Sequence, residues 1–206
     1  MKKLLILLFS ILISFNSYGF FGLFEKTVCL DAVAQERNYL IHLPNETKPF
    51  TGSDLCKDED GQILSEGKVN NGKITSLTKY EYYKNGQKKS ERNYKTVGEE
   101  HYIDHETEDG KQILWYENGL KNEEVNYKDG ILDGKWTSWY ENGQIKAEHN
   151  YKDGILDGKW TWWYENGQKR AEGNYKDGKD DGKLTYWHEN GQLDFEGYYK
   201  DGEIVH

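Results

Sequence analysis

A cluster of histidine and acidic side chains is the first place in the sequence where metal chemistry could occur. His101 and His105 stand four residues apart. The acidic side chains around them are Glu99, Glu100, Asp104 and Glu106. A spacing of four puts two imidazoles on one face of a helix, and on one face of a strand at a larger separation. Because no third ligand follows at a characteristic spacing, we interpret this stretch as a polar loop and predict no metal site.

Carboxylates also recur once in every repeat of the C-terminal half, as Glu124, Glu148, Glu172 and Glu196. With two strands per repeat, neighbouring members should lie about 10 Å apart, which is too far to share one ion. We predict a solvated face on which nearby lysines neutralise these glutamates. The recurring Asp-Gly pairs, such as Asp129-Gly130, lack the series of oxygen ligands of a calcium loop, so we interpret them as turns.

Motifs that would indicate catalysis are missing from the sequence. It contains no Gly-x-Ser-x-Gly elbow, Walker loop or dinucleotide-binding glycine pattern. We therefore predict that the protein is not an enzyme and has no catalytic residues, metal or cofactor. The two cysteines, Cys29 and Cys56, either form a disulfide or remain two buried thiols, and the sequence leaves both possibilities open. A disulfide would close a 28-residue loop and contribute roughly 3 to 4 kcal/mol of stability.

A repeat of 24 residues organises the C-terminal half of the chain. Glycines mark it at Gly119, Gly143, Gly167 and Gly191. Tryptophans mark it at Trp115, Trp139, Trp163 and Trp187. Upstream the pattern weakens, and we count about six units from Phe50 to the C-terminus. The predicted organisation is a signal peptide at 1–19, an N-terminal leader or cap at 20–49, degenerate repeats at 50–110 with an insertion near 96–110, and regular repeats at 111–206.

Each unit reads as a β-hairpin. Two short aromatic-rich stretches are divided by Asn-Gly on one side and by Lys-Asp-Gly on the other. Asn-Gly is the strongest short hairpin signal, because both residues tolerate the positive φ of a type I′ turn. The predicted structural turns are Asn142-Gly143, Asn166-Gly167 and Asn190-Gly191. Apolar runs of four to six residues and frequent glycines argue against helix, so we predict an all-β fold.

Aromatic side chains are expected on both faces of these hairpins. Alternation puts Trp136, Ser138 and Tyr140 on one face, and Thr137 and Trp139 on the other. One unit buries too little apolar area to offset the entropy of ordering its backbone, so units must stack. The candidate aromatic binding surface consists of Trp136, Trp139, Trp160, Trp162, Trp163 and Trp187.

Trp162 differs from the other tryptophans in one respect. The stretch "YKDGILDGKWTSWYENGQ" at 127–144 returns at 151–168 with Ser138 alone replaced, by Trp162. Either Trp162 belongs to an exposed surface on which a protein or glycan stacks, or it fills space in the core. Both interpretations stay open.

The N-terminus predicts export. Lys2 and Lys3 precede an uncharged apolar run at 4–15, and Ser17-Tyr18-Gly19 provides small residues for cleavage before Phe20. Twelve residues are too few to span a bilayer, and no later segment is apolar enough. The formal charge of −9 becomes −11 when both lysines are removed with the signal. Nucleic acid and anionic lipid are therefore unfavourable partners.

The stretch "DGKWTWWYENGQKRAEGNYKDGKDDGKLTYWHENGQ" resembles the MORN repeat, in the bacterial form often labelled YwqK-type antitoxin component. The residues that carry the resemblance include Gly158, Trp160, Tyr164, Asn166, Gly167, Glu172, Gly173 and Tyr175. Leu184 and His188, and Val125 and His149 in place of glycine, depart from the pattern. The resemblance implies an elongated antiparallel sheet of stacked hairpins that acts as a binding platform, with no catalytic residues.

We predict a non-catalytic, exported repeat scaffold that mediates protein–protein interaction at the cell envelope or outside the cell. One alternative is a cell-wall glycan-binding module, because sugar rings stack on exposed tryptophan. A second alternative is a toxin-neutralising, or immunity, protein that meets its toxin after export.

Overall fold

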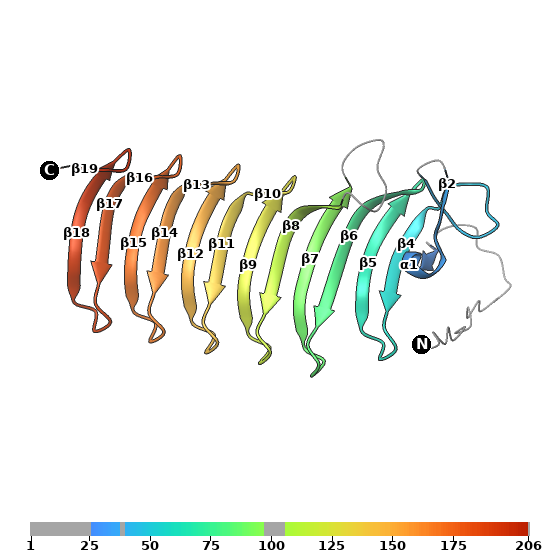
Figure 1. Cartoon of the computed structure of the whole chain (residues 1–206), viewed down its shortest axis with the longest axis horizontal. Helices are drawn as coiled ribbons and strands as arrows, with labels where there is room; N and C mark the ends of the chain where they lie inside the picture. Colours follow the sequence, from blue (N-terminus) through green and yellow to red (C-terminus); the bar gives the residue numbers. More distant parts are fainter. Residues whose placement is uncertain (1–25, 38–39, 97–105, 206) are drawn as a thin grey trace, which may run out of the picture.

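The described chain forms an elongated β-sheet that is single-layered except at its N-terminal end. The structure, a computed structural model, describes residues 26–37, 40–96 and 106–205. A 17-stranded sheet contains most of the described chain and confirms the predicted all-β fold of stacked hairpins (Figure 1). Within these ranges no helix is long and apolar enough to cross a bilayer. The predicted signal peptide, His101 and His105 lie outside the described residues.

A short N-terminal segment precedes the repeats. Its elements are β1 (Thr27–Val28), α1 (Leu30–Val33), β2 (Gln35–Arg37) and β3 (Leu40–His42). β1 pairs in parallel with β4, and β2 and β3 form a separate antiparallel pair. We call the described residues between 27 and 50 the N-terminal cap.

Six long antiparallel hairpins follow in chain order. They are β4 (Gly52–Lys57) with β5 (Ile63–Asn70), β6 (Lys73–Tyr82) with β7 (Lys88–Thr96), β8 (Glu106–Trp115) with β9 (Lys121–Lys128), β11 (Gly134–Trp139) with β12 (Ile145–Lys152), β14 (Gly158–Trp163) with β15 (Lys169–Lys176), and β17 (Gly182–Trp187) with β18 (Leu193–Lys200). Shorter strands extend the connections: β10 (Ile131–Leu132), β13 (Ile155–Leu156), β16 (Lys179–Asp180) and β19 (Glu203–Val205).

The two kinds of turn line opposite long edges of the sheet, with the Asn-Gly turns along the lower edge and the Asp-Gly turns along the upper edge of Figure 1. Asp153 and Gly154 have φ values of 48° and 81°, and the flanking Lys152 and Ile155 pair with each other. Positive φ at both central residues of a two-residue loop is the type I′ conformation. Asp129-Gly130, Asp153-Gly154 and Asp177-Gly178 therefore form turns, as predicted, and they are the tight ones. The second series, such as Asp133-Gly134, instead leads into a long strand, since β11 begins at Gly134.

The prediction of a type I′ turn at Asn-Gly is wrong. Gly143 has a φ of 85°, whereas Asn142 is not in the positive-φ region. The amide of Gly143 donates to the carbonyl of Tyr140 at 2.9 Å, and the amide of Tyr140 donates to the carbonyl of Gln144 at 2.8 Å. This is a three-residue loop with a left-handed glycine. The reason is that the Asn142 carboxamide oxygen accepts from the Gln144 amide, at 2.9 Å, and so stabilises the longer loop.

Side chains of the Asn-Gly edge bind each unit to the next one. The Asn142 amide donates to the carbonyl of Glu165 in the following turn, at 3.0 Å. Tyr140 donates its hydroxyl to the carbonyl of Trp163, 2.8 Å away. The same two bonds recur at Tyr116 and Asn118 of the preceding unit. These repeated bonds set the stacking of neighbouring units, because each one satisfies a backbone carbonyl of the next hairpin.

Replacing Tyr140 by phenylalanine should lower the free energy of unfolding by about 0.5 to 1.5 kcal/mol, because it removes one such bond and leaves the Trp163 carbonyl without its donor. Equilibrium urea unfolding measures the change. Tyr198→Phe is the matched control, since the Tyr198 side chain is exposed, and its effect should stay below about 0.5 kcal/mol. Equal losses in the two variants would contradict a role of the hydroxyl in stacking.

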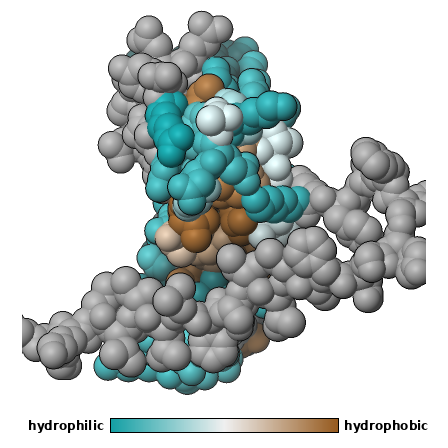
Figure 2. Space-filling model, turned by 90° about the vertical axis from the view of Figure 1, so that its right-hand side faces the viewer, coloured by the Kyte–Doolittle hydropathy of each residue, from teal (hydrophilic) through white to brown (hydrophobic). Residues whose placement is uncertain are grey.

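The main buried cluster lies under the N-terminal cap. Cap residues Leu30, Ile41, Leu43 and Phe50 pack on Val69, Ile74 and Leu77 of the sheet. Figure 2 views this end of the molecule and shows apolar side chains gathered at the centre with hydrophilic ones around them. The cap thus gives the first hairpins a second layer, which a single sheet lacks by itself.

Candidate functional site

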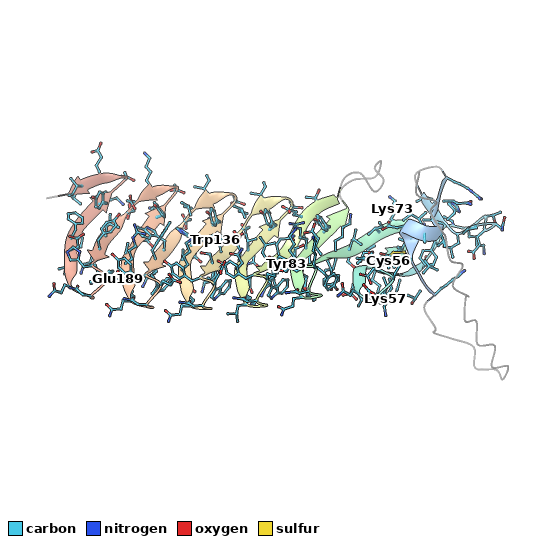
Figure 3. All side chains as sticks on the ribbon, turned by 60° about the horizontal axis from the view of Figure 1, so that its bottom comes forward. Cys56, Lys57, Lys73, Tyr83, Trp136 and Glu189 are labelled. Atoms are coloured by element: carbon cyan, nitrogen blue, oxygen red, sulfur yellow. A yellow bond between two sulfur atoms is a disulfide. The ribbon has the colours of Figure 1, made fainter. Side chains whose placement is uncertain are left out.

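The two faces of the sheet differ in chemistry from β11 to β18. We call the face that carries Trp136, His149, Trp160, Trp162, Tyr175 and Tyr186 the aromatic face. The opposite, ionic face carries Thr137, Glu148, Thr161 and Glu172 together with lysines. The strand pairings Trp136 with His149 and Thr137 with Glu148 place these residues on opposite faces, as alternation predicted. Figure 3 shows side chains projecting along the whole length of the sheet, with Trp136 labelled.

Lysine–glutamate pairs neutralise the ionic face, which confirms the prediction of a solvated, lysine-paired row of glutamates. Lys135 lies 2.6 Å from Glu148, and Lys183 lies 2.8 Å from Glu196. The hydrogen bond from Lys169 lowers the pKa of Glu172, partial burial opposes this, and Lys159 adds to the lowering. Such solvent-exposed pairs contribute little stability, from 0 to about 1 kcal/mol each.

The six predicted tryptophans divide evenly between the faces. Trp136, Trp160 and Trp162 lie on the aromatic face, whereas Trp139, Trp163 and Trp187 lie on the ionic face. Lysine ammonium groups lie over two of the latter, with Lys121 at 5.4 Å from the Trp139 ring centre and Lys169 at 5.8 Å from that of Trp187. A cation over an aromatic ring is a favourable contact, so these two rings are already engaged.

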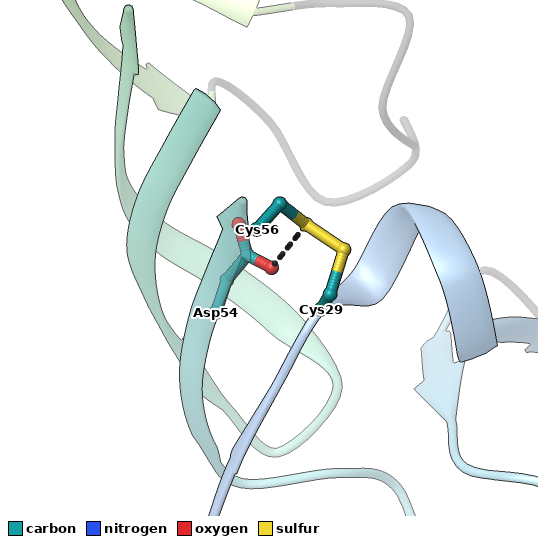
Figure 4. A group of neighbouring side chains, drawn as sticks. All are labelled: Cys29, Asp54 and Cys56. Carbon is teal, nitrogen blue, oxygen red and sulfur yellow. Dashed lines mark hydrogen bonds between the residues drawn. A yellow bond between two sulfur atoms is a disulfide. The ribbon is translucent and has the colours of Figure 1, made fainter. Parts of the chain in front are cut away.

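The cap covers the same sheet face at its N-terminal end. Cys29 and Cys56 form a disulfide, and the Asp54 carboxylate accepts from the amide of Leu30 at 2.9 Å. Figure 4 shows Asp54 beside this disulfide. Asp54 also accepts from the hydroxyl of Ser65, at 2.8 Å. In the described part of the chain, Cys29, Asp54 and Cys56 are close enough for metal ligation, but sulfurs joined in a disulfide offer no thiolates.

Over β11–β18 no part of the described chain covers the aromatic face, and its rings form a row. The Trp136 and His149 rings are 5.1 Å apart, His149 and Trp162 are 5.8 Å apart, and Trp160 and Tyr175 are 5.7 Å apart. Trp160 is 6 % exposed, because its indole lies against Gly173, where an added Cβ would be only 2.8 Å from the ring. Trp162 is 37 % exposed. The sequence left open whether Trp162 lies on the surface or in the core. In the structure Trp162 lies on the surface, whereas the neighbouring Trp160 lies in the core.

A hollow of about 290 Å³ opens in this row between β12 and β17. Its walls contain the indole and phenol rings of Trp160, Trp162, Tyr175 and Tyr186. The remaining lining side chains are His149, Arg170, Ala171 and Asp180. We call it the aromatic hollow. Concave, mostly aromatic sites with a few polar groups are typical of binding sites, so it is the candidate functional site.

Two electrostatic features define the aromatic hollow. Burial lowers the pKa of His149, which therefore contributes a neutral ring at pH 7. Burial raises the pKa of Tyr175, and the negative charge of Asp180 adds to the rise, so this carboxylate lies near the phenol. The ring nitrogen Nδ1 of His149 and Nε1 of Trp160 have no hydrogen-bond partner among the described residues.

Acidification from about pH 7 to pH 5 should destabilise the protein through His149. Since the folded-state pKa of His149 lies below its ordinary value of about 6.5, the unfolded chain takes up the proton first. The stability that the neutral His149 ring contributes is fully present above about pH 6.5 and is lost as the pH falls towards the folded-state pKa of His149. Carboxylates with lowered pKa, such as Glu172, lose their contribution only below about pH 4.5.

The comparison that tests this is urea unfolding at several pH values in the parent and in His149→Gly. Glycine is the residue at the equivalent position 173 of the next unit, so the backbone tolerates it. The variant should show a smaller loss of stability between pH 7 and pH 5. Parallel pH profiles would assign the acid sensitivity to other groups.

Sequence reasoning did not single out Tyr175, Tyr186, Arg170 or Asp180. Tyr175 was visible as a repeat position, and Asp180 stands where earlier units have Leu132 and Leu156. A comparison of the units position by position, on one sheet face at a time, would have found this difference.

The fold and this surface define a class of protein: a repeat array that exposes a long, chemically patterned surface. The family model for the MORN repeat variant matches residues 77–96, 108–129, 132–153, 156–177 and 180–201, together more than half of the chain. The chain therefore belongs to the MORN-repeat proteins.

Other comparisons add little to this assignment. No curated protein matches the sequence. A solved structure of a protein of unknown function from Bacteroides fragilis is 13 % identical, covers 74 % of this chain and 95 % of that one, and has a TM-score of 0.22. At that TM-score the likeness bears on neither fold nor function.

Proposed function

We propose that this protein is a non-catalytic scaffold, exported from the cytoplasm, that binds a protein partner through the aromatic face of β11–β18. One observation carries the proposal. The sheet face that the cap covers at β4–β7 continues without a cover over β11–β18, where it exposes aromatic side chains. Such an exposed aromatic surface on a soluble fold favours an interaction site.

Two features support export. The sequence at 1–19 has the order of charge, apolar run and small residues of a secretory signal. Disulfides such as Cys29–Cys56 persist mainly in oxidising compartments outside the cytoplasm. N-terminal sequencing of the protein from cell fractions should find a chain that begins at Phe20 outside the cytoplasm. An uncleaved cytoplasmic chain would refute export.

The antitoxin label of related repeats would be a special case of the same function, in which the partner is a toxin met after export. A glycan is the second candidate ligand, favoured by the aromatic hollow, because sugar rings stack on exposed indoles. Retention on cell-wall material that free sugar reverses would favour this candidate over a protein.

The main test places a photo-cross-linking amino acid at Trp162 of the full chain in the cells that produce it. The matched control places it at the adjacent Trp163, on the ionic face. We expect one identified polypeptide, cross-linked through a reproducible peptide at Trp162 and not at Trp163. The purified partner should bind the parent and bind Trp162→Ser at least about tenfold more weakly. Equal cross-linking at both positions, or none, would refute the proposal.

A further inference from the structure

Hollows recur along the aromatic face, since one of about 280 Å³ lined in part by Tyr127, Trp136 and Tyr151 lies upstream. The aromatic hollow differs from it in its lining residues. Relative to the copy at 127–144, the unit that contains it has Trp162 in place of Ser138. It also has Asp180 in place of Leu156 at the residue paired with the recurring tyrosine. Both changes fall on the lining of the hollow. They give one place on a periodic surface an individual shape and charge.

Opposite charges lie at the two ends of the hollow. Arg170 is near the start of β15, whereas Asp180 pairs with Tyr175, five residues farther along the same strand. At about 3.2 to 3.4 Å per residue, the two residues are about 16 to 17 Å apart along the strand. The Arg170 guanidinium lies 5.9 Å from the ring centre of Tyr164, towards the Asn-Gly edge.

These two charges differ from the charges of the ionic face. There, lysines pair with Glu148, Glu172 and Glu196. Neither Arg170 nor Asp180 has an ion-pair partner within the residues that the structure describes. Since no ion pair neutralises them, both charges remain available to charged groups of a bound molecule.

The size of the hollow limits what enters it. A volume of about 290 Å³ is at the lower end of small-molecule sites and has room for one large side chain. A spacing of about 16 to 17 Å along the strand corresponds to about five residues of an extended polypeptide. One saccharide ring is too short to contact both Arg170 and Asp180 at this spacing, whereas a peptide that lies along β15 reaches both residues.

We propose that the aromatic hollow binds an extended peptide segment of the partner, with one aromatic or branched apolar side chain between Trp162 and Tyr186. An acidic residue of the segment pairs with Arg170, and a basic residue about five positions away pairs with Asp180. The inference rests on the proposed protein-binding function and states the chemistry of the partner's contact segment.

Selection from a display library of random twelve-residue peptides on the full chain tests this inference. Counter-selection on Trp162→Ser removes peptides that bind elsewhere. Serine is the residue that the preceding copy has at the equivalent position, Ser138. Enriched peptides should carry an acid and a base about five residues apart around an apolar residue. Their affinity, followed by tryptophan fluorescence, should fall at least about tenfold in Trp162→Ser.

Charge reversal supplies the decisive comparison. Arg170→Glu should change the preference to peptides with two basic residues at this spacing, and Asp180→Lys to peptides with two acidic residues. Absence of Trp162-dependent peptides, enrichment without the charge spacing, or unchanged preferences in both variants would overturn the inference. If a partner cross-links at Trp162 but ignores both reversals, the proposed function stands and this inference fails. Binding of muropeptide sugar fragments instead of peptides would overturn both.

Discussion

Trp160→Ala is expected to lower the free energy of unfolding by about 3 to 5 kcal/mol, the usual cost of deleting a buried large aromatic side chain. Trp160 is 6 % exposed and forms a buried cluster with Ala171 and Leu184. In a single-layered sheet no second layer can move in to fill the space. The deletion therefore leaves a cavity or exposes the cluster to water.

Equilibrium urea unfolding followed by circular dichroism measures this loss, and hydrogen exchange shows where it occurs. Because repeat arrays are coupled mainly between neighbours, β12–β17 should lose protection before β4–β6. The matched control is Trp162→Ser, two residues away on the same face. It should cost less than about 1 kcal/mol, since Trp162 is 37 % exposed and Ser138 occupies the equivalent position of the preceding copy. Similar costs for both variants would show that Trp162 is part of the core and would remove it from the binding surface.

Removal of the Cys29–Cys56 disulfide is expected to cost about 3 to 4 kcal/mol, from the loop-closure entropy of a sequence separation of 27 residues. Without the disulfide, the cap is held on the sheet by the buried apolar cluster, by the pairing of β1 with β4, by backbone hydrogen bonds such as that from Ile41 to Gly72, and by the bond from Leu30 to Asp54. Loss of the disulfide should therefore release the cap locally and expose Val69 and Leu77.

The double variant Cys29→Ser/Cys56→Ser, compared with the oxidised parent, tests this without leaving reactive thiols. Amides of β3–β5 should exchange faster, and proteases should cleave within 30–57, while β14–β18 stay protected. Asp54→Asn in the oxidised chain separates the covalent contribution from the hydrogen bonds. Unchanged exchange in the cap after reduction would mean that apolar packing and hydrogen bonds hold it without the disulfide.

Much of the architecture could be predicted because its signals are local. The Gly143 and Asp153-Gly154 turns follow from residues that tolerate positive φ, and alternation placed Trp136 and Thr137 on opposite faces. The type I′ turn predicted at Asn142-Gly143 occurs instead at Asp153-Gly154. The Asn142 carboxamide stabilises a three-residue loop through its bond to the Gln144 amide, which the preference of Asn-Gly for two-residue turns does not take into account. The site was only partly visible, since its members come from β12, β14, β15, β16 and β17.

The sequence by itself determined the 24-residue period, the strands, the turn positions and the two-faced alternation, since each depends on residues that are near one another in the chain. Only the tertiary structure decided that the cap covers the N-terminal part of one face, and that Trp162 and Asp180 meet in a hollow on the open remainder of it. The physical reason is that both results depend on contacts between hairpins. In this sheet those contacts are set by the hydrogen bonds that join each unit to the next and by the covalent attachment of the cap.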